Sequence, residues 1–143
     1  MTEIIAIACD HGGLALKEQL LKSFPHVQWL DLGTSSAGSV DYPDYAGKLA
    51  AALKDGKASK GVLICGSGIG ISIAANRYAH VRCALVHDVT GARLCRQHND
   101  ANVIALGGRV TGVEVARDCV DVFLSAEFEG GRHQGRVDKL SAC

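Results

Sequence analysis

Short apolar runs that alternate with helical stripes constrain the fold of this chain more than any other feature. Continuous apolar runs at 4–8 and 61–64 are typical of strands that are covered on both faces. Further strands are expected at 27–32, 82–86 and 102–106. Strands that alternate with helices predict βαβ units and a mainly parallel sheet.

Apolar side chains at helical spacing predict a helix after each strand. The expected helices cover 13–24, 42–53, 69–79, 89–97, a segment with Ala116, Val120, Phe123 and Leu124 on one face, and a last stretch from about Gly131 onward. Right-handed crossovers then give a three-layer, doubly wound, Rossmann-like α/β fold. We therefore expect one domain over 1–143, with a five-stranded parallel sheet, helices on both faces and a C-terminal helix.

The overall charge and composition exclude several classes of partner. Lys+Arg and Asp+Glu are both 15, so neither nucleic acid nor a membrane is an expected partner. There is no long apolar span and no charged leader before an apolar stretch, which predicts a cytoplasmic protein. The six cysteines include no CxxC pair, so most are expected to be reduced, buried and inert.

Polar and glycine-rich segments follow four of the predicted strands. They are 10–13, 65–72, 87–88 and 107–109. Ligands of open parallel sheets bind beyond the carboxyl ends of the strands. This convergence predicts a functional site at that edge of the sheet.

The segment Cys65-Gly66-Ser67-Gly68-Ile69-Gly70-Ile71-Ser72 carries the most specific chemistry. A thiol placed where a strand turns into a helix meets free backbone N–H groups and ionises more easily than in water. Ile71 excludes a dinucleotide fingerprint, which needs Gly or Ala there, and a cysteine-phosphatase loop, which needs Arg. No Gly-Lys-Ser/Thr triplet supports a Walker A loop. What remains is a short anion-binding turn beside an activated thiol.

Two further candidates each permit two interpretations. Asp10 either caps the following helix or acts catalytically. His98 ends a helix, where a cation suits the helix dipole, so a structural role competes with a catalytic one. Since His98 precedes the amino end of strand 102–106, a catalytic His98 would reach the site of a partner subunit. Cys95 and His98 stand three apart, but no second ligand pair accompanies them, and no metal site is expected.

The tail is the other concentration of chemistry. Arg132 and Arg136 are four apart and would share a helix face, which suits a phosphate. A solvated basic face paired with Glu127 and Glu129 is the alternative, and the sequence leaves both open.

These residues together resemble the type B ribose-5-phosphate isomerases, a family shared with the subunits of galactose-6-phosphate isomerase. The resemblance runs from Ile4 to Leu140. Its elements are Cys9-Asp10-His11-Gly12-Gly13, Asp41-Tyr42-Pro43, the stretch 64–76, Arg96-Gln97-His98-Asn99-Asp100-Ala101-Asn102-Val103, Gly107-Gly108-Arg109-Val110 and Glu129-Gly130-Gly131-Arg132-His133-Gln134. Ser67 stands where family members often carry Thr, so the hydroxyl is kept.

The resemblance implies aldose–ketose isomerisation of ribose 5-phosphate and ribulose 5-phosphate through a cis-enediolate. Cys65 would be the proton-transfer base, Ser67 would assist at the oxygens, and Asp10 with His98 would open the sugar ring. The other implied site residues are the oxyanion amides of Gly66, Gly68, Ile69 and Gly70, Asn99 for the open chain, and His11, Arg109, Arg132, His133 and Arg136 for the phosphate or distal hydroxyls. Homodimers or tetramers with sites at subunit interfaces, and no metal or organic cofactor, are implied as well.

Two alternatives stay open at this point. One is an isomerase for a tetrulose, allose or galactose phosphate, since Tyr42, the loop 33–41 and His87 are expected at the pocket mouth and would set the sugar. The other is a non-catalytic module that binds phosphosugars or nucleotides. A thiol base with Asp10 and His98 argues against the second, because binding alone requires no thiol.

Overall fold

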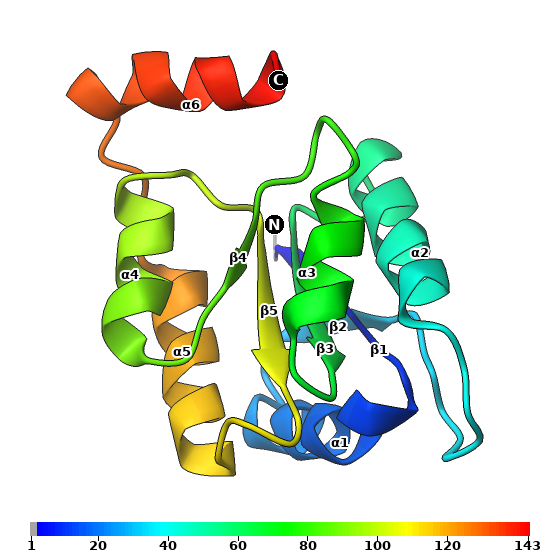
Figure 1. The fold of residues 1–143 in the computed structure, drawn as a ribbon. Coiled ribbons are helices and arrows are strands. Elements are labelled where there is room, and N and C mark those ends of the chain that lie inside the picture. The colour runs from blue at the N-terminus through cyan, green and yellow to red at the C-terminus, as the bar shows by residue number, and fades with distance from the viewer. Residues whose placement is uncertain (1–2) are drawn as a thin grey trace.

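One parallel sheet forms the centre of the molecule. The computed structural model describes residues 3–143, and its five strands lie in the order β2-β1-β3-β5-β4, every neighbouring pair parallel (Figure 1). The strands are β1 (Ile4–Cys9), β2 (Gln28–Asp31), β3 (Lys60–Cys65), β4 (Cys83–Leu85) and β5 (Val103–Gly107). The predicted α/β fold with a five-stranded parallel sheet is confirmed.

Helices cover both faces of this sheet. They are α1 (Leu14–Ser23), α2 (Tyr42–Lys54), α3 (Ile69–Ala75), α4 (Val89–Gln97), α5 (Val113–Ser125) and α6 (Gln134–Ser141). Residues of α2 and α3 pack in one hydrophobic cluster, and residues of α1, α4 and α5 pack in the other. The three layers therefore follow the sequence-based expectation.

The alternation of side chains along β1 assigns each residue to one of these clusters. Ile5, Ile7 and Cys9 face the layer of α1, α4 and α5, whereas Ala6 and Ala8 face α2 and α3. A strand covered on both faces has no polar side, so β1 reads as a continuous apolar run.

Three helix boundaries differ from the expectation. The first helix starts with a 3₁₀ turn, His11–Gly13, and α6 follows another, Gly131–His133. α3 ends at Ala75 instead of 79, and the adjoining β4 is shorter than 82–86. The side chain of Asn76 explains the early end of α3, because its amide donates to the carbonyl of Cys83 at 2.9 Å and accepts the Cys83 N–H at 2.8 Å. A side-chain amide that pairs with a strand backbone stops the helix at its C-cap.

The two ends of the sheet carry different elements. The strand arrows point toward the turns after β3 and β5, whereas α6 lies at the opposite end, beyond the amino ends of the strands (Figure 1). Within residues 3–143, none of the helices combines the length and the apolar character that a membrane span requires.

Candidate active site

A cavity opens at the carboxyl edge of the sheet, where β1 and β3 lie side by side. The chain runs from β1 outward to β2 and then returns to β3 on the other side, which makes this the topological switch point of the sheet. The cavity measures about 530 Å³ and is lined by Asp10, Tyr42, Cys65, Gly66, Ser67, Ile69, Gly70, Arg109 and Val110. Residues that follow β1, β3 and β5 therefore meet residues of α2 and α3 here, whereas the predicted segment 87–88 after β4 does not line this cavity.

Close backbone contacts hold these loops together. A Cβ on Gly108 would lie 2.5 Å from the carbonyl oxygen of Gly12, and one on Gly13 would lie 2.5 Å from that of Ile64. Any larger residue would push the loops apart. The backbone N–H of Gly108 also donates to the Cys65 carbonyl at 2.8 Å, which places the loop after β5 directly beside the thiol.

The thiol of Cys65 is buried and receives a backbone hydrogen bond. Its side chain is 4% exposed, and the N–H of Gly68 donates to Sγ at 3.1 Å. Gly68 has φ +80°, a left-handed conformation that favours glycine and turns its amide toward the sulfur. α3 has only seven residues, so the sulfur meets this single backbone amide directly rather than the end of a long helix.

Four other cysteines lie in settings that keep them protonated. Burial raises the pKa of Cys9, Cys95 and Cys119 to about 11 and that of Cys83 to about 12. These thiols are therefore neutral at physiological pH and pack as small apolar side chains. The expectation that most cysteines are inert agrees with this arrangement.

Asp10 performs its capping role while it lines the cavity. Its Oδ1 accepts the N–H groups of Gly12 at 2.9 Å and Gly13 at 3.2 Å. The two interpretations from the sequence are thus compatible, because Oδ2 stays available to a ligand.

The glycine turn is less open than the sequence suggests. Ser67 Oγ accepts the N–H of Ile69 at 3.1 Å, and the Gly68 N–H is engaged by the thiol. Two of the amides in 66–70 are therefore already directed at side chains. Tyr42 covers the next residue, because a Cβ on Gly70 would lie 2.6 Å from its ring carbon Cζ.

His11 and His87 lie outside the lining of this cavity. The N–H of Val40 donates to His11 Nδ1 at 3.2 Å, which joins His11 to the loop 33–41 and places the ring proton of a neutral His11 on Nε2. His87 borders a smaller cavity of about 250 Å³ that shares Val110 with the first.

The remaining predicted residues gather at the amino edge of the sheet. His98, Asn99, Arg132, His133 and Arg136 line a cavity of about 390 Å³. The rings of His98 and His133 stack with centroids 4.3 Å apart and planes 15° apart. Burial, followed by the nearby His98 and Arg132, lowers the pKa of His133, which favours its neutral form.

The two clusters are separate within one chain. Gly61 pairs with Val103 at one end of β3, and Cys65 pairs with Gly107 at the other. Four strand steps of about 3.3 Å each put roughly 13 Å between those two ends. His98 precedes Val103, so one chain does not bring it to Cys65.

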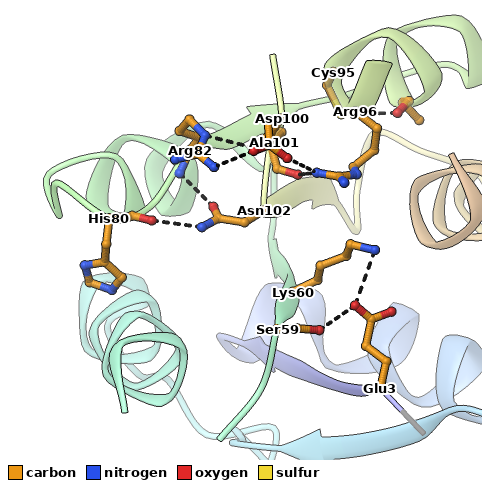
Figure 2. A network of polar contacts seen from close by, with 11 residues as sticks. Glu3, Ser59, Lys60, His80, Arg82, Cys95, Arg96, Asp100, Ala101 and Asn102 are labelled. Atoms are coloured by element: carbon orange, nitrogen blue, oxygen red, sulfur yellow. Dashed lines mark hydrogen bonds and ion pairs between the residues drawn. The ribbon is translucent and has the colours of Figure 1, made fainter. Parts of the chain in front are cut away.

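The turn that presents His98 and Asn99 is held by a polar network (Figure 2). Asp100, with φ +48°, accepts from Arg96 Nη1 at 2.9 Å and from Arg82 Nη2 at 3.2 Å. Arg82 Nε also donates to the Asp100 carbonyl at 2.8 Å, and Arg96 Nη1 donates to that of Ala101 at 2.7 Å. Two guanidinium groups therefore fix the backbone on which both candidates depend.

Sequence reasoning missed two residues at these clusters. Val110 lines the first cavity although it is 60% exposed, and Glu129 Oε1 lies 3.8 Å from Nε2 of both His98 and His133. The position of Val110 directly after Gly107-Gly108-Arg109, in a loop that follows a predicted strand, could have indicated the first. The four-residue spacing of Glu129 and His133 could have indicated the second.

Comparison with known proteins finds similarity over almost the whole chain. The ribose/galactose isomerase family matches residues 5–140. Ribose-5-phosphate isomerase B of Escherichia coli is 46% identical over 140 residues, which cover 96% of this chain and 94% of that protein. The crystal structure of a ribose 5-phosphate isomerase from Thermotoga maritima is 45% identical, with a TM-score of 0.97 and complete coverage of both chains. The type B enzyme of Trypanosoma brucei is 41% identical, with a TM-score of 0.95 and 99% coverage of each chain.

Proposed function

This chain belongs to the ribose/galactose isomerase family of sugar-phosphate isomerases, and we propose that it interconverts ribose 5-phosphate and ribulose 5-phosphate. The observation that carries the proposal is the buried Cys65 sulfur, which accepts an amide N–H within a cavity that Asp10 and Arg109 also line. The similarity to ribose-5-phosphate isomerases at 41–46% identity supports the choice of sugar.

The proposed reaction moves one proton between two neighbouring carbons. The Cys65 thiolate removes the proton from C2 of the open-chain aldose, the C1 carbonyl becomes an enediolate oxygen, and the thiol returns the proton to C1. Amides of the 66–70 turn that are not directed at side chains hold the oxygen, and each such donor contributes roughly 3 kcal/mol. Ser67 moves the proton between the oxygens, and Asp10 Oδ2 with His98 opens the ring.

We further propose that a homodimer or tetramer completes each site. The carboxyl-edge cluster lacks His98 and the tail arginines, whereas the amino-edge cluster lacks a thiol. Exposed apolar side chains beside both clusters support an interface, namely Ile69 at 51%, Ile73 at 61% and Leu140 at 49% exposure. Large exposed apolar residues that border incomplete sites are typical of subunit contacts.

Arg132→Ala and Arg136→Ala are each expected to raise KM for a phosphorylated sugar by about 10- to 100-fold, with kcat changed far less. A charge-assisted contact to phosphate stabilises substrate and transition state alike by roughly 1.5–3 kcal/mol. Steady-state kinetics on ribose 5-phosphate measure this. Arg117→Ala is the matched control, since Arg117 lies exposed on α5 and pairs only loosely with Glu114 at 3.9 Å. If Arg132→Ala and Arg136→Ala behave like the control, the two arginines form a solvated basic face and do not bind the phosphate.

A panel of four-, five- and six-carbon sugar phosphates tests the assigned sugar. We expect kcat/KM to be highest for ribose 5-phosphate and lower by at least about 100-fold for unphosphorylated ribose, because the lost phosphate contacts are uncompensated. A preference for a four- or six-carbon sugar phosphate would agree with isomerase activity but would overturn ribose 5-phosphate as the substrate. Equal activity on free ribose would overturn the phosphate sites.

A further inference from the structure

Three side chains at the amino edge offer metal-binding atoms to one point. Nε2 of His98 and Nε2 of His133 each lie 3.8 Å from Glu129 Oε1, and the three side chains offer one ligand atom each within 4.8 Å of one another. Of the two residues that the sequence raised for a metal, Cys95 and His98, only His98 belongs to this cluster. His98 instead has two partners from the segment between α5 and α6.

The spacing is close to that of a coordination sphere. Bonds of about 2.1 Å at tetrahedral angles put neighbouring ligand atoms about 3.4 Å apart. The imidazole–carboxylate distances need to shorten by only a few tenths of an ångström. The two imidazole rings, which stack with planes 15° apart, must rotate out of the stack so that both nitrogen lone pairs face the ion.

The ligands also stand on backbone that is held in place. The N–H of Glu129 donates to the carbonyl of Gln97 at 3.0 Å, which joins its segment to the residue before His98. His133 is 7% exposed and is the N-cap residue of α6. Ligands on fixed backbone lose little entropy when they bind a cation.

The donor set selects the class of cation. Two imidazoles and one carboxylate match the open three-ligand sites that Zn²⁺ occupies, whereas Mg²⁺ and Ca²⁺ prefer oxygen donors throughout. Arg132 and Arg136 line the same cavity, and their charges oppose a dication. The expected affinity is therefore lower than that of a structural zinc site.

We propose that His98, Glu129 and His133 form a binding site for Zn²⁺ or a similar divalent transition metal, and that the bound cation competes with the phosphosugar. Metal binding is inferred from the geometry of the cluster alone. Competition with the phosphosugar rests on the proposed function, which assigns His98 and His133 to the substrate.

Metal binding is tested on the full chain after chelator treatment. Titration with Co²⁺, followed by visible absorption, is expected to give a tetrahedral spectrum at one ion per chain, and calorimetry with Zn²⁺ should give the same stoichiometry. Glu129→Gln should weaken binding at least about tenfold because it removes the only anionic ligand. Glu127→Gln, an exposed acid two residues away, is the matched control and should bind as the parent does.

Three outcomes would overturn the site. The first is equal affinity in the two glutamate variants. The second is absorption typical of Co²⁺–thiolate bonds, which would place the ion at Cys65 or the exposed Cys143. The third is binding only at millimolar concentration.

Competition between the bound metal and the phosphosugar is tested by steady-state kinetics. Zn²⁺ should raise the apparent KM for ribose 5-phosphate with kcat unchanged, EDTA should reverse the effect, and Glu129→Gln should lose most of its sensitivity relative to its own metal-free rate. If the cation binds but KM does not change, the competition is overturned and the metal site is kept. If the chain is inactive on every sugar phosphate, the proposed function is overturned, and the spectroscopic evidence for the metal site is unaffected.

Discussion

Cys65→Ala is expected to lower kcat for isomerisation by about 1,000-fold while the protein still binds ribose 5-phosphate. A positioned base contributes roughly 100- to 10,000-fold, and alanine cannot accept a proton. The substitution removes one buried sulfur atom and leaves the Gly68 amide facing a small void, so the fold should survive. Turnover by proton exchange at C2 and ligand binding by calorimetry measure the two effects separately.

Cys119→Ala is the matched control for this experiment. Cys119 is buried on α5, and burial raises the pKa of its thiol to about 11, so it is no base at neutral pH. We expect its kcat to stay near that of the parent. If the two alanine variants had equal turnover, Cys65 would lose its assignment as base. If Cys65→Ala abolished binding as well as turnover, the thiol would have a structural role instead.

Mixing two inactive variants is expected to restore about a quarter of the parent activity if sites form between subunits. In a dimer of one Cys65→Ala chain and one His98→Ala chain, one site combines the intact Cys65 of one subunit with the intact His98 of the other. The second site lacks both. Random exchange makes about half of the dimers mixed, and each mixed dimer has one working site of two.

The physical basis is the distance between the clusters. Cys65 ends β3 and His98 precedes the amino end of the adjacent β5, so roughly 13 Å of strand separates them in one chain. Subunit exchange should be verified by native mass spectrometry of differently tagged chains. Mixed dimers that form without any recovery of activity would place both residues in one subunit's site, and a fully active His98→Ala variant would remove His98 from catalysis.

The order of the strands and helices could be predicted because the relevant signals are local. The two-residue alternation in β1 and the helical stripe in α5 reflect burial that each segment repeats along its own length. The exact ends of the helices and strands were harder to predict. α3 stops at Ala75 because Asn76 pairs with Cys83, seven residues further along the chain, and periodicity carries no trace of that contact.

The site could be predicted in part, because residues that directly follow the strands can be located from the order of the sequence. The rule that parallel strands deliver their ligands at one edge placed Asp10, Cys65 and Arg109 together, and one cavity contains all three. The sequence also placed His98 before a strand's amino end, where a catalytic role would require the site of a partner subunit. Glu129 was interpreted only as a partner for arginine, because its distance to His98 depends on how the segment after α5 returns to α4.

The sequence alone therefore determined the α/β architecture, the family and the chemical groups present at each strand end, since these depend on local periodicity and on residues in order. The tertiary structure decided the strand order β2-β1-β3-β5-β4, the Gly68 amide on the Cys65 sulfur, and the division of the candidate residues into two clusters. Such features are distances between atoms that only packing brings near, and the free energy that sets them is shared among many contacts across the whole domain.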